Sequence, residues 1–257
     1  MPRMLVIVLV VGLISGLLVG GFHNLFTVPV MERAIVLEEA RALAESGGVV
    51  DDEEPLVTLG VQRFGMAVGT GIYGAIMGLI FAGGYGILRR VRPNWHPVVL
   101  ALAVGALGFW ALSLFPFIRY PLMPPGVGSE DTLFSRQLWQ SVFIILSTVG
   151  VAGLLLAVRY LNARQISVTQ RTQYIGLALL AYAIFALIIV FAIPGNPDPA
   201  PVPIDLLELF RTLPMVGQFL QWVLLAVGVG LALVWYQRKE EAARTTGDMA
   251  ANAPGGD

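Results

Sequence analysis

The chain has 257 residues, of which 56% are hydrophobic and only 13% are charged, and its mean hydropathy is +0.76. Soluble domains carry about 25% charged residues, so this composition excludes an ordinary soluble protein and indicates a membrane protein. The net charge of −1 argues against a nucleic-acid-binding protein, and the absence of cysteine excludes disulfides and thiolate metal sites.

Six uncharged stretches are each long enough to cross a bilayer as a helix. We therefore predict an all-α membrane protein, a six-transmembrane-helix bundle within a single polytopic domain over residues 1–240. Residues 241–257 are expected to form a disordered cytoplasmic tail. The first stretch follows a basic start, but it is too long for a typical signal peptide and is retained as a span. The predicted spans cover residues 4–30, 64–88, 96–116, 138–158, 173–193 and 216–236.

Basic residues gather in alternate loops of this bundle. Segments 89–95 and 159–173 each carry three arginines and no acid, and with Arg3 and the tail they hold ten of the sixteen basic residues. The other alternate loops hold thirteen of the seventeen acids. The positive-inside rule then predicts that both termini are cytoplasmic and that the acidic loops face outward.

Glycines are spaced four apart in the first two spans. Gly12, Gly16 and Gly20 share this spacing, and the second span holds eight glycines, among them the pairs Gly65/Gly69 and Gly74/Gly78. Such spacing favours close packing of helices in lipid, and a glycine-lined solute path is the alternative. The segment 31–46 lacks helix breakers and is predicted to continue the first helix past Pro29.

The outer loops are rich in proline and are predicted to be structured. In 119–139, "YPLMPPGVG" is stiffened by proline, and Ser129 is the expected N-cap of the fourth span, with Glu130 and Asp131 in its first turn. Arg136 lies inside that helix and needs a carboxylate or carbonyl partner, for which Glu32 and Asp205 are the candidate carboxylates. This loop is therefore interpreted as an outer vestibule rather than a metal site.

Two other outer segments carry acids. Residues 51–54 are all acidic and are interpreted as solvated loop, although they could attract cations. Five prolines between Pro194 and Pro203 exclude a regular helix there. Asp205 and Glu208 then form an acidic variant of the capping box, which predicts a short helix leading into the sixth span.

Little in the sequence indicates catalysis. No nucleotide-binding loop and no H-E-x-x-H motif occurs, and the two histidines, His23 and His96, have no adjacent nucleophile pattern. We expect no enzyme and no cofactor. His96 follows Trp95, where an interfacial aromatic belt is expected.

The candidate metal ligands lie at the outer end of the first span. His23, Asn24 and Glu32 supply imidazole, amide and carboxylate groups, which suit a divalent cation. Positions 24 and 32 share one face of an unbroken helix, but Pro29 lies between them. The alternative is that His23 only reaches interfacial water.

Four segments occur in an order that resembles one family: "VPVMERAIVLEEA", "VQRFGMAVGTGIYGAIMGLIF", "YPLMPPGVGSEDTLFSRQLWQ" and "GNPDPAPVPIDLLELFRTLPMVGQFLQW". They resemble the CbtA family of cobalt-transporter subunits of prokaryotic membranes, over about residues 4–236. The first outer loop of relatives can be rich in histidine, whereas Arg33–Gln62 has none. The residues that match the family pattern are Pro29, Glu32, Glu39, Pro124, Pro125, Gly126, Arg136, Gln137, Trp139, Asn196, Pro197, Arg211, Gln218 and Trp222.

The resemblance implies a multi-pass protein of the prokaryotic cytoplasmic membrane that takes part in cobalt uptake for cobalamin synthesis. It also implies a small histidine-bearing membrane partner of the CbtB type beside the lipid bilayer, and no nucleic acid. Our first hypothesis is accordingly a transport subunit for a divalent cation, with cobalt as the ion. The alternatives are a non-transporting membrane scaffold or partner-binding protein, and a transporter of another small solute.

Overall fold

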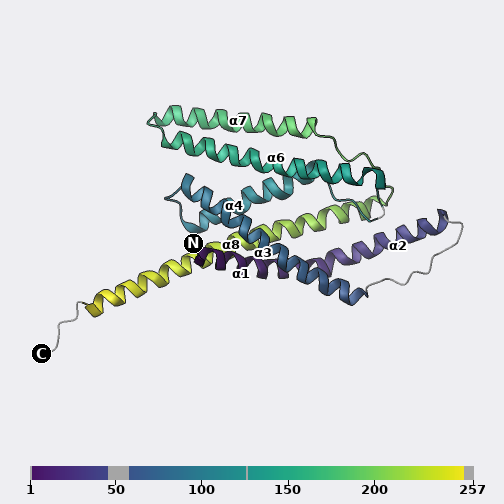
Figure 1. Cartoon of the computed structure of the whole chain (residues 1–257), viewed down its shortest axis with the longest axis horizontal. Helices are drawn as coiled ribbons and strands as arrows, with labels where there is room; N and C mark the ends of the chain where they lie inside the picture. The colour runs from purple at the N-terminus through teal and green to yellow at the C-terminus, as the bar shows by residue number, and fades with distance from the viewer. Residues whose placement is uncertain (1, 46–57, 126, 252–257) are drawn as a thin grey trace.

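The computed structural model describes residues 2–45, 58–125 and 127–251. These residues form helices joined by short connections, and no strand occurs among them. The connections 92–96 and 164–167 lie at one end of an elongated bundle, and the chain turns back at the other end after residues 119 and 192 (Figure 1). The acidic segment 51–54 and Gly126 lie outside the described residues. The helical elements are α1 (Pro2–Phe22), η1 (His23–Thr27), α2 (Val28–Glu45), α3 (Leu59–Val91), α4 (Pro97–Phe109), η2 (Trp110–Leu114), α5 (Phe115–Arg119), α6 (Glu130–Ala163), α7 (Val168–Ala192) and α8 (Ile204–Ala251).

Six continuous helical units are long and apolar enough to cross a membrane, which confirms the predicted helical class and number of spans. The first unit joins α1, the π-helical turn η1 and α2, so the predicted continuation past Pro29 is confirmed. The third joins α4, the π-helical turn η2 and α5. Arg3 in α1 pairs with Glu240 in α8, so the beginning of the first unit and the end of the sixth lie at the same end of the bundle.

Close approach of α1 to α3 depends on glycine. A Cβ atom added at Gly12 would collide with the Gly74 carbonyl oxygen, and one added at Gly78 would collide with that of Val8. A Cβ atom added at Gly16 would collide with the Thr70 carbonyl oxygen of α3. The prediction of close packing is confirmed for these glycines, whereas a Cβ at Gly65 or Gly69 would meet nothing within 4 Å.

The main core lies where α4 and α8 pack together beside α1 and α3. A Cβ at Gly105 would come within 2.7 Å of the Ala226 side chain, so α4 and α8 approach closely there. Trp222 of α8 and Phe81 of α3 are almost completely buried. A second cluster, around Phe143 and Ile189, joins α6 to α7 and to α5.

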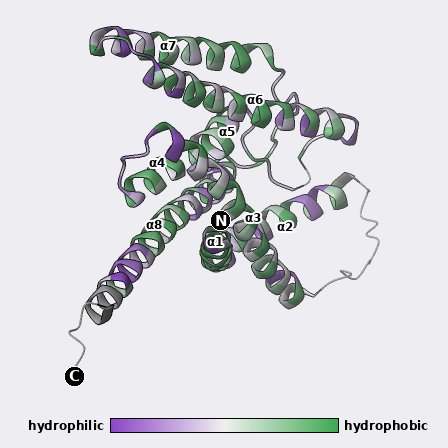
Figure 2. Ribbon diagram, turned by 60° about the vertical axis from the view of Figure 1, so that its left-hand side comes forward, coloured by the Kyte–Doolittle hydropathy of each residue, from purple (hydrophilic) through white to green (hydrophobic). Residues whose placement is uncertain are grey.

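Apolar side chains also cover the outside of the bundle, and polar residues concentrate toward helix ends (Figure 2). α7 is the extreme case, because Ile189 is its one buried residue and Phe191 is 81% exposed. This surface suits lipid, in which exposed leucine and phenylalanine carry no penalty.

Two helices, α6 and α8, begin directly after the proline-rich loops. Ser129 caps α6, where its hydroxyl accepts a hydrogen bond from the Asp131 backbone N–H at 3.2 Å, so the predicted cap is confirmed. The last helix differs from its prediction, because α8 begins at Ile204 and runs through Pro214 as one helix. Asp205 therefore lies in its first turn and is not the cap.

At its other end, α8 continues to Ala251, into the segment predicted to be a disordered tail. Glutamate, alanine and arginine dominate residues 240–244, and these residues favour a helix even without tertiary contacts. Residues 252–257 lie outside the described part of the chain.

Candidate functional site

Three of the six helical units are interrupted, and their interruptions lie around one cavity. The first unit is interrupted by the π-helical turn η1. The third unit is interrupted by the π-helical turn η2, which Pro116 follows. The sixth contains Pro214 within α8. A π-helical turn shifts the hydrogen-bond pattern, and a proline lacks the N–H that would bond to the carbonyl one turn earlier. Broken helices of this kind are tolerated in membranes where they line a cavity, and transporters use them for binding.

The inner cavity between these interruptions has a volume of about 200 Å³ and a partly polar lining. Imidazole, amide, hydroxyl and thioether groups all reach it, each of which can ligate a metal ion. His23 is the one histidine on its wall, and no aspartate, glutamate, lysine or arginine of the described residues lines it. The polar or sulfur-bearing lining residues are His23, Tyr73, Ser113, Tyr120, Gln140, Met215 and Gln218.

Hydrogen bonds position the polar wall of the inner cavity. The Tyr73 hydroxyl donates to Oε1 of Gln218 at 3.1 Å, and the Ser113 hydroxyl donates to the same oxygen at 3.2 Å. Trp222 Nε1 in turn donates to Ser113 Oγ at 3.1 Å. The network thus joins α3, η2 and α8, and it fixes the Gln218 amide at the cavity.

His23 is held on two sides. Its Nδ1 lies 2.8 Å from Thr27 Oγ1, within the same π-helical turn. Its ring also lies directly against α8, because a Cβ at Gly217 would come within 2.5 Å of Nε2. In the tautomer whose Nδ1–H donates to Thr27, Nε2 carries the lone pair through which a neutral imidazole binds a cation.

A smaller cavity of about 160 Å³ adjoins the inner one, and we call it the outer cavity because it lies beside the loops predicted to face outward. The two share Tyr120, Leu122 and Gln140 as lining residues. The outer cavity adds Arg136, Gln137 and Asn196, which the sequence assigned to a vestibule. Polar side chains therefore continue from the outer loops to His23.

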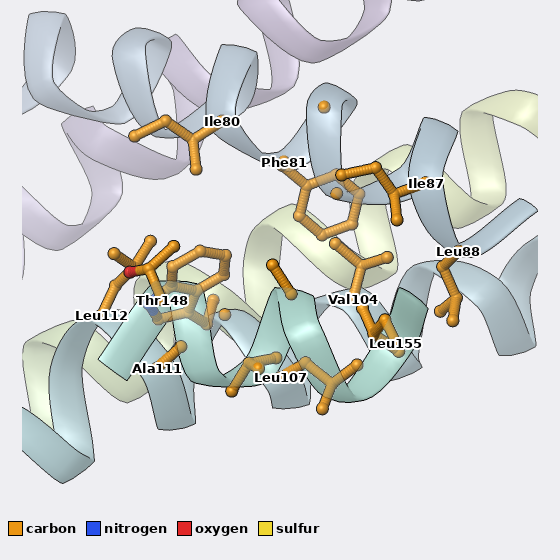
Figure 3. Close-up of a pocket in the computed structure, with 16 residues that line it drawn as sticks. Ile80, Phe81, Ile87, Leu88, Val104, Leu107, Ala111, Leu112, Thr148 and Leu155 are labelled. Carbon is orange, nitrogen blue, oxygen red and sulfur yellow. The ribbon is translucent and has the colours of Figure 1, made fainter. Parts of the chain in front are cut away.

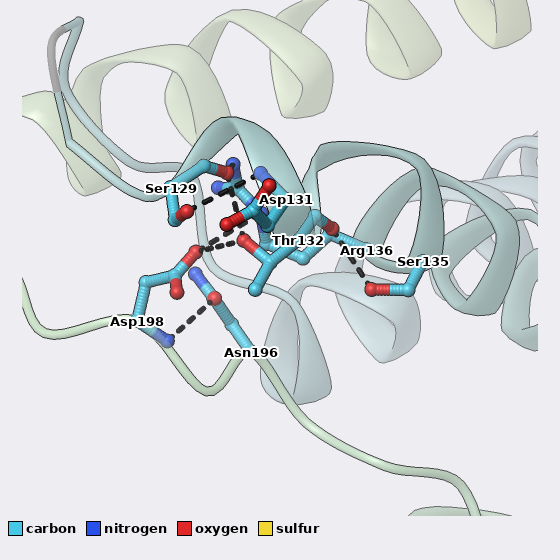
Figure 4. Close-up of polar contacts among 7 residues, drawn as sticks. All are labelled: Ser129, Asp131, Thr132, Ser135, Arg136, Asn196 and Asp198. Carbon is cyan, nitrogen blue, oxygen red and sulfur yellow. Dashed lines mark hydrogen bonds and ion pairs between the residues drawn. The ribbon is translucent and has the colours of Figure 1, made fainter.

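Arg136 is paired with Asp198 at this outer cavity (Figure 4). Arg136 Nε lies 3.1 Å from Asp198 Oδ2, although the N–H is not aligned for a hydrogen bond. The two predicted carboxylate partners were wrong, because Glu32 pairs with Arg63 at 3.0 Å and Asp205 pairs with Arg33 at 3.3 Å. Proximity in the folded loops decides this pairing. The expected carbonyl partner is present, since Arg136 Nη2 donates to the Ser129 carbonyl at 3.3 Å.

The loops around the outer cavity are tied to one another. Arg119 donates two hydrogen bonds to the Ile193 carbonyl, and the Tyr120 hydroxyl donates to the Pro194 carbonyl. Burial raises the pKa of Tyr120 while the Arg119 charge opposes the shift, so the hydroxyl remains a donor at neutral pH. Arg211 of α8 donates to the Leu122 carbonyl at 3.4 Å.

The remaining predicted residues have simpler positions. Pro124 is buried in the 120–129 loop, and Pro125 is half-buried beside it. Pro197 and Trp139 are exposed. Asn196 Oδ1 accepts a hydrogen bond from the Asp198 backbone N–H at 3.0 Å and so shapes the turn before Asp198.

The three candidate metal ligands do not share one environment. His23 lines the inner cavity, whereas Asn24 donates to the Gly20 carbonyl at 3.0 Å and Glu32 is paired with Arg63. Within the described residues, no three histidine, aspartate or glutamate side chains lie close enough together to hold an ion. His96 caps α4, where its Nδ1 accepts from the Val98 N–H at 3.4 Å.

Sequence reasoning missed Tyr73, Ser113 and Gln140 as cavity residues. Each is a polar residue within a largely apolar span, which is the available signal for a pathway residue in a membrane. Proline at positions 116 and 214, inside two predicted spans or at their edges, was the second signal.

Comparison with known proteins gives one match. The chain matches a family model described as "Probable cobalt transporter subunit (CbtA)" over residues 1–234. No curated protein and no solved structure matches the chain.

Proposed function

Because this chain belongs to the CbtA family of cobalt transporter subunits, we propose that it carries a divalent cation, cobalt, into the cell through the cavities at its interrupted helices. The imported ion would supply cobalamin synthesis. In this proposal both termini are cytoplasmic, the outer cavity faces the exterior, and a small CbtB-type partner assembles with the chain in the bilayer.

One observation carries the proposal, namely that His23 and the amide of Gln218 lie on the wall of a single partly polar cavity between helices long enough to cross a membrane. A borderline cation such as cobalt binds well to imidazole, and carbonyl and hydroxyl oxygens can complete its coordination. A site without carboxylates holds the ion weakly, which favours release after binding.

The outer cavity would act as the entrance. Asp198 offsets the charge of Arg136, so the arginine does not present an isolated positive charge to an approaching cation. The amides of Gln137, Gln140 and Asn196 then offer oxygens along the way inward.

The membrane potential can drive such uptake without a nucleotide site. Moving one charge through 100 mV releases about 2.3 kcal/mol, so a doubly charged ion gains about 4.6 kcal/mol on moving inward.

The test is uptake of labelled cobalt by cells that express the chain, with His23→Ala compared with His96→Ala. His96 caps a helix end and lines neither cavity, so its variant controls for loss of a histidine. We expect His23→Ala to lower cobalt uptake at least about tenfold, which is the usual effect of losing a residue that orients a metal ligand. His96→Ala should take up cobalt at the rate of the wild type. Parallel assays with nickel, zinc and manganese would define the ion.

Two outcomes contradict the proposal. Uptake by the wild type equal to that of empty-vector cells, with the protein confirmed in the membrane, excludes transport by this chain. Crosslinks from the loop 194–203 to a partner, without ion flux, would then favour the membrane-scaffold alternative. Full activity of His23→Ala would show that the ion takes another route.

A further inference from the structure

A third cavity, of about 300 Å³, lies between α3, α4, η2, α6 and Trp222 of α8 (Figure 3). Its lining is apolar apart from two side chains, and neither offers a free donor. The Thr148 hydroxyl donates to the Ile144 carbonyl at 2.8 Å, and Trp222 Nε1 donates to Ser113. The lining of this groove therefore favours a hydrocarbon ligand.

The groove runs along the membrane helices rather than across them. Ile80 and Thr148 lie near one end of it, and Leu88 and Leu155 lie near the other (Figure 3). The eight residue steps from Ile80 to Leu88 correspond to a length of about 12 Å at 1.5 Å per residue. Ile80 is 45% exposed and Ile87 is 39% exposed, so the groove opens to the outside of the bundle.

A helix does not fit this space. An α-helix with side chains is about 10–12 Å across, and a piece 12 Å long would need roughly three times the volume of the groove. An extended acyl chain is thin enough. Lipid tails also surround the groove, because all of its lining residues lie within membrane-spanning units.

Arginines lie just beyond one end of the groove. Arg89 and Arg90 follow Leu88 directly, and Arg159 lies one helical turn after Leu155. All three are exposed, and none of them forms an ion pair with an acid of the described residues. Basic groups that flank a groove between membrane helices bind the phosphates of anionic lipids.

We propose that the groove holds one acyl chain of an anionic phospholipid, whose phosphate lies against Arg89, Arg90 and Arg159. Tail and lining are equally apolar, so selectivity comes from the charged headgroup and not from the tail. The lipid would fill the gap between α3 and α6 and seal the outer side of Trp222, the residue that supports Ser113 at the inner cavity.

Glycine positions on α3 allow a matched test. A Cβ at Gly83 or at Gly86 meets nothing within 4 Å, but only Gly83 lines the groove. Gly83→Leu places a side chain where the acyl chain would lie, and Gly86→Leu makes the same change outside the groove. For the charges, Arg89→Gln/Arg90→Gln/Arg159→Gln is compared with Arg238→Gln/Lys239→Gln/Arg244→Gln, which removes equal charge from the end of α8.

The measurement is native mass spectrometry of the full chain in detergent with phosphatidylglycerol or phosphatidylcholine added. We expect the wild type and both controls to retain phosphatidylglycerol preferentially. Each groove arginine should contribute about fivefold to this preference. Gly83→Leu should lose the tightly held lipid, while the arginine variant should keep it without headgroup preference.

Three results would overturn the proposal. The first is equal retention of the two lipids by the wild type, and the second is equal behaviour of Gly83→Leu and Gly86→Leu. The third concerns a protein occupant: since the chain has no cysteine, a Gly83→Cys variant that forms disulfide dimers in membranes would show that a second copy covers the groove.

Discussion

Arg136 and Asp198 form the least exposed ion pair of the described residues, with Nε and Oδ2 3.1 Å apart and side chains 18% and 10% exposed. Asp198 also accepts a hydrogen bond from Thr132 Oγ1 at 2.6 Å. One carboxylate thus joins the loop 193–203 to the first turns of α6. Gly128, with φ of 107°, leaves room for the guanidinium, since a Cβ there would come within 2.6 Å of it.

Removing the charge of Asp198 should therefore destabilise the outer end of the bundle. We expect Asp198→Asn to lower the free energy of unfolding by about 2 kcal/mol, less than for a fully buried pair because both groups keep some contact with water. For a chain of this size that corresponds to roughly 4–8 °C in melting temperature, measured on purified protein in detergent.

Asp205→Asn is the matched control for this prediction. Its pair with Arg33 is exposed, with side chains 57% and 63% accessible, and such pairs contribute about 0.5 kcal/mol or less. Equal melting temperatures for the two variants would show that the Arg136 pair contributes no more than a surface pair.

The helix contact between α1 and α3 gives a second prediction. A side chain at Gly74 would meet the backbone of Gly12 and Gly16, which cannot move aside without separating the helices. We expect Gly74→Leu to cost at least about 3 kcal/mol and to reduce the amount of folded protein recovered by size-exclusion chromatography.

Gly69→Leu makes the same substitution on the same helix, where a Cβ would meet nothing within 4 Å. It should behave as the wild type. A comparable loss for both variants would attribute the effect to general insertion defects and not to the α1–α3 contact.

Much of the fold could be predicted because lipid imposes simple rules. Uncharged length identified the six spans, glycine spacing identified the α1 contact surface, and Ser129 identified the beginning of α6. Each of these depends on residues close in sequence. The partner of Arg136 does not, since Asp198 lies sixty-two positions away in a proline-rich loop whose path only the fold determines.

The site was predicted less completely for a related reason. His23 could be singled out as a lone histidine in an apolar span, but the π-helical turns that place it and Ser113 on one cavity have no clear sequence signal. Glu32 was placed on one helix face with Asn24 by helix register, whereas in the structure it pairs with Arg63.

Gln218 gives the third prediction, which concerns transport. Its Oε1 accepts from both Tyr73 and Ser113, so Gln218→Leu removes the shared acceptor of two hydroxyl groups and one candidate oxygen ligand. We expect cobalt uptake to fall about tenfold or more while the protein stays in the membrane.

Gln218→Glu is the informative comparison, since it keeps an acceptor at the same position and adds a charge that attracts cations. It should retain cobalt binding and slow its release, seen as a lower apparent KM together with a lower maximal rate. If Gln218→Leu takes up cobalt as fast as the wild type, the hydrogen-bond network around Gln218 is not part of the transport route.

The fourth prediction uses the buried contact between Gln221 and Ser15. Gln221 Nε2 donates to Ser15 Oγ at 3.1 Å, and the two residues are 1% and 2% exposed. Ser15 keeps a second partner, because its hydroxyl donates to the Val11 carbonyl at 2.7 Å.

Ser15→Ala should therefore lower the free energy of unfolding more than Gln221→Leu does. It leaves the buried Gln221 amide without an acceptor, which costs about 1–3 kcal/mol. Gln221→Leu leaves Ser15 bonded within its own helix and should cost about 1 kcal/mol or less. Melting temperatures of the two variants in one detergent decide the order, and the reverse order would mean that the Gln221 amide does not depend on Ser15.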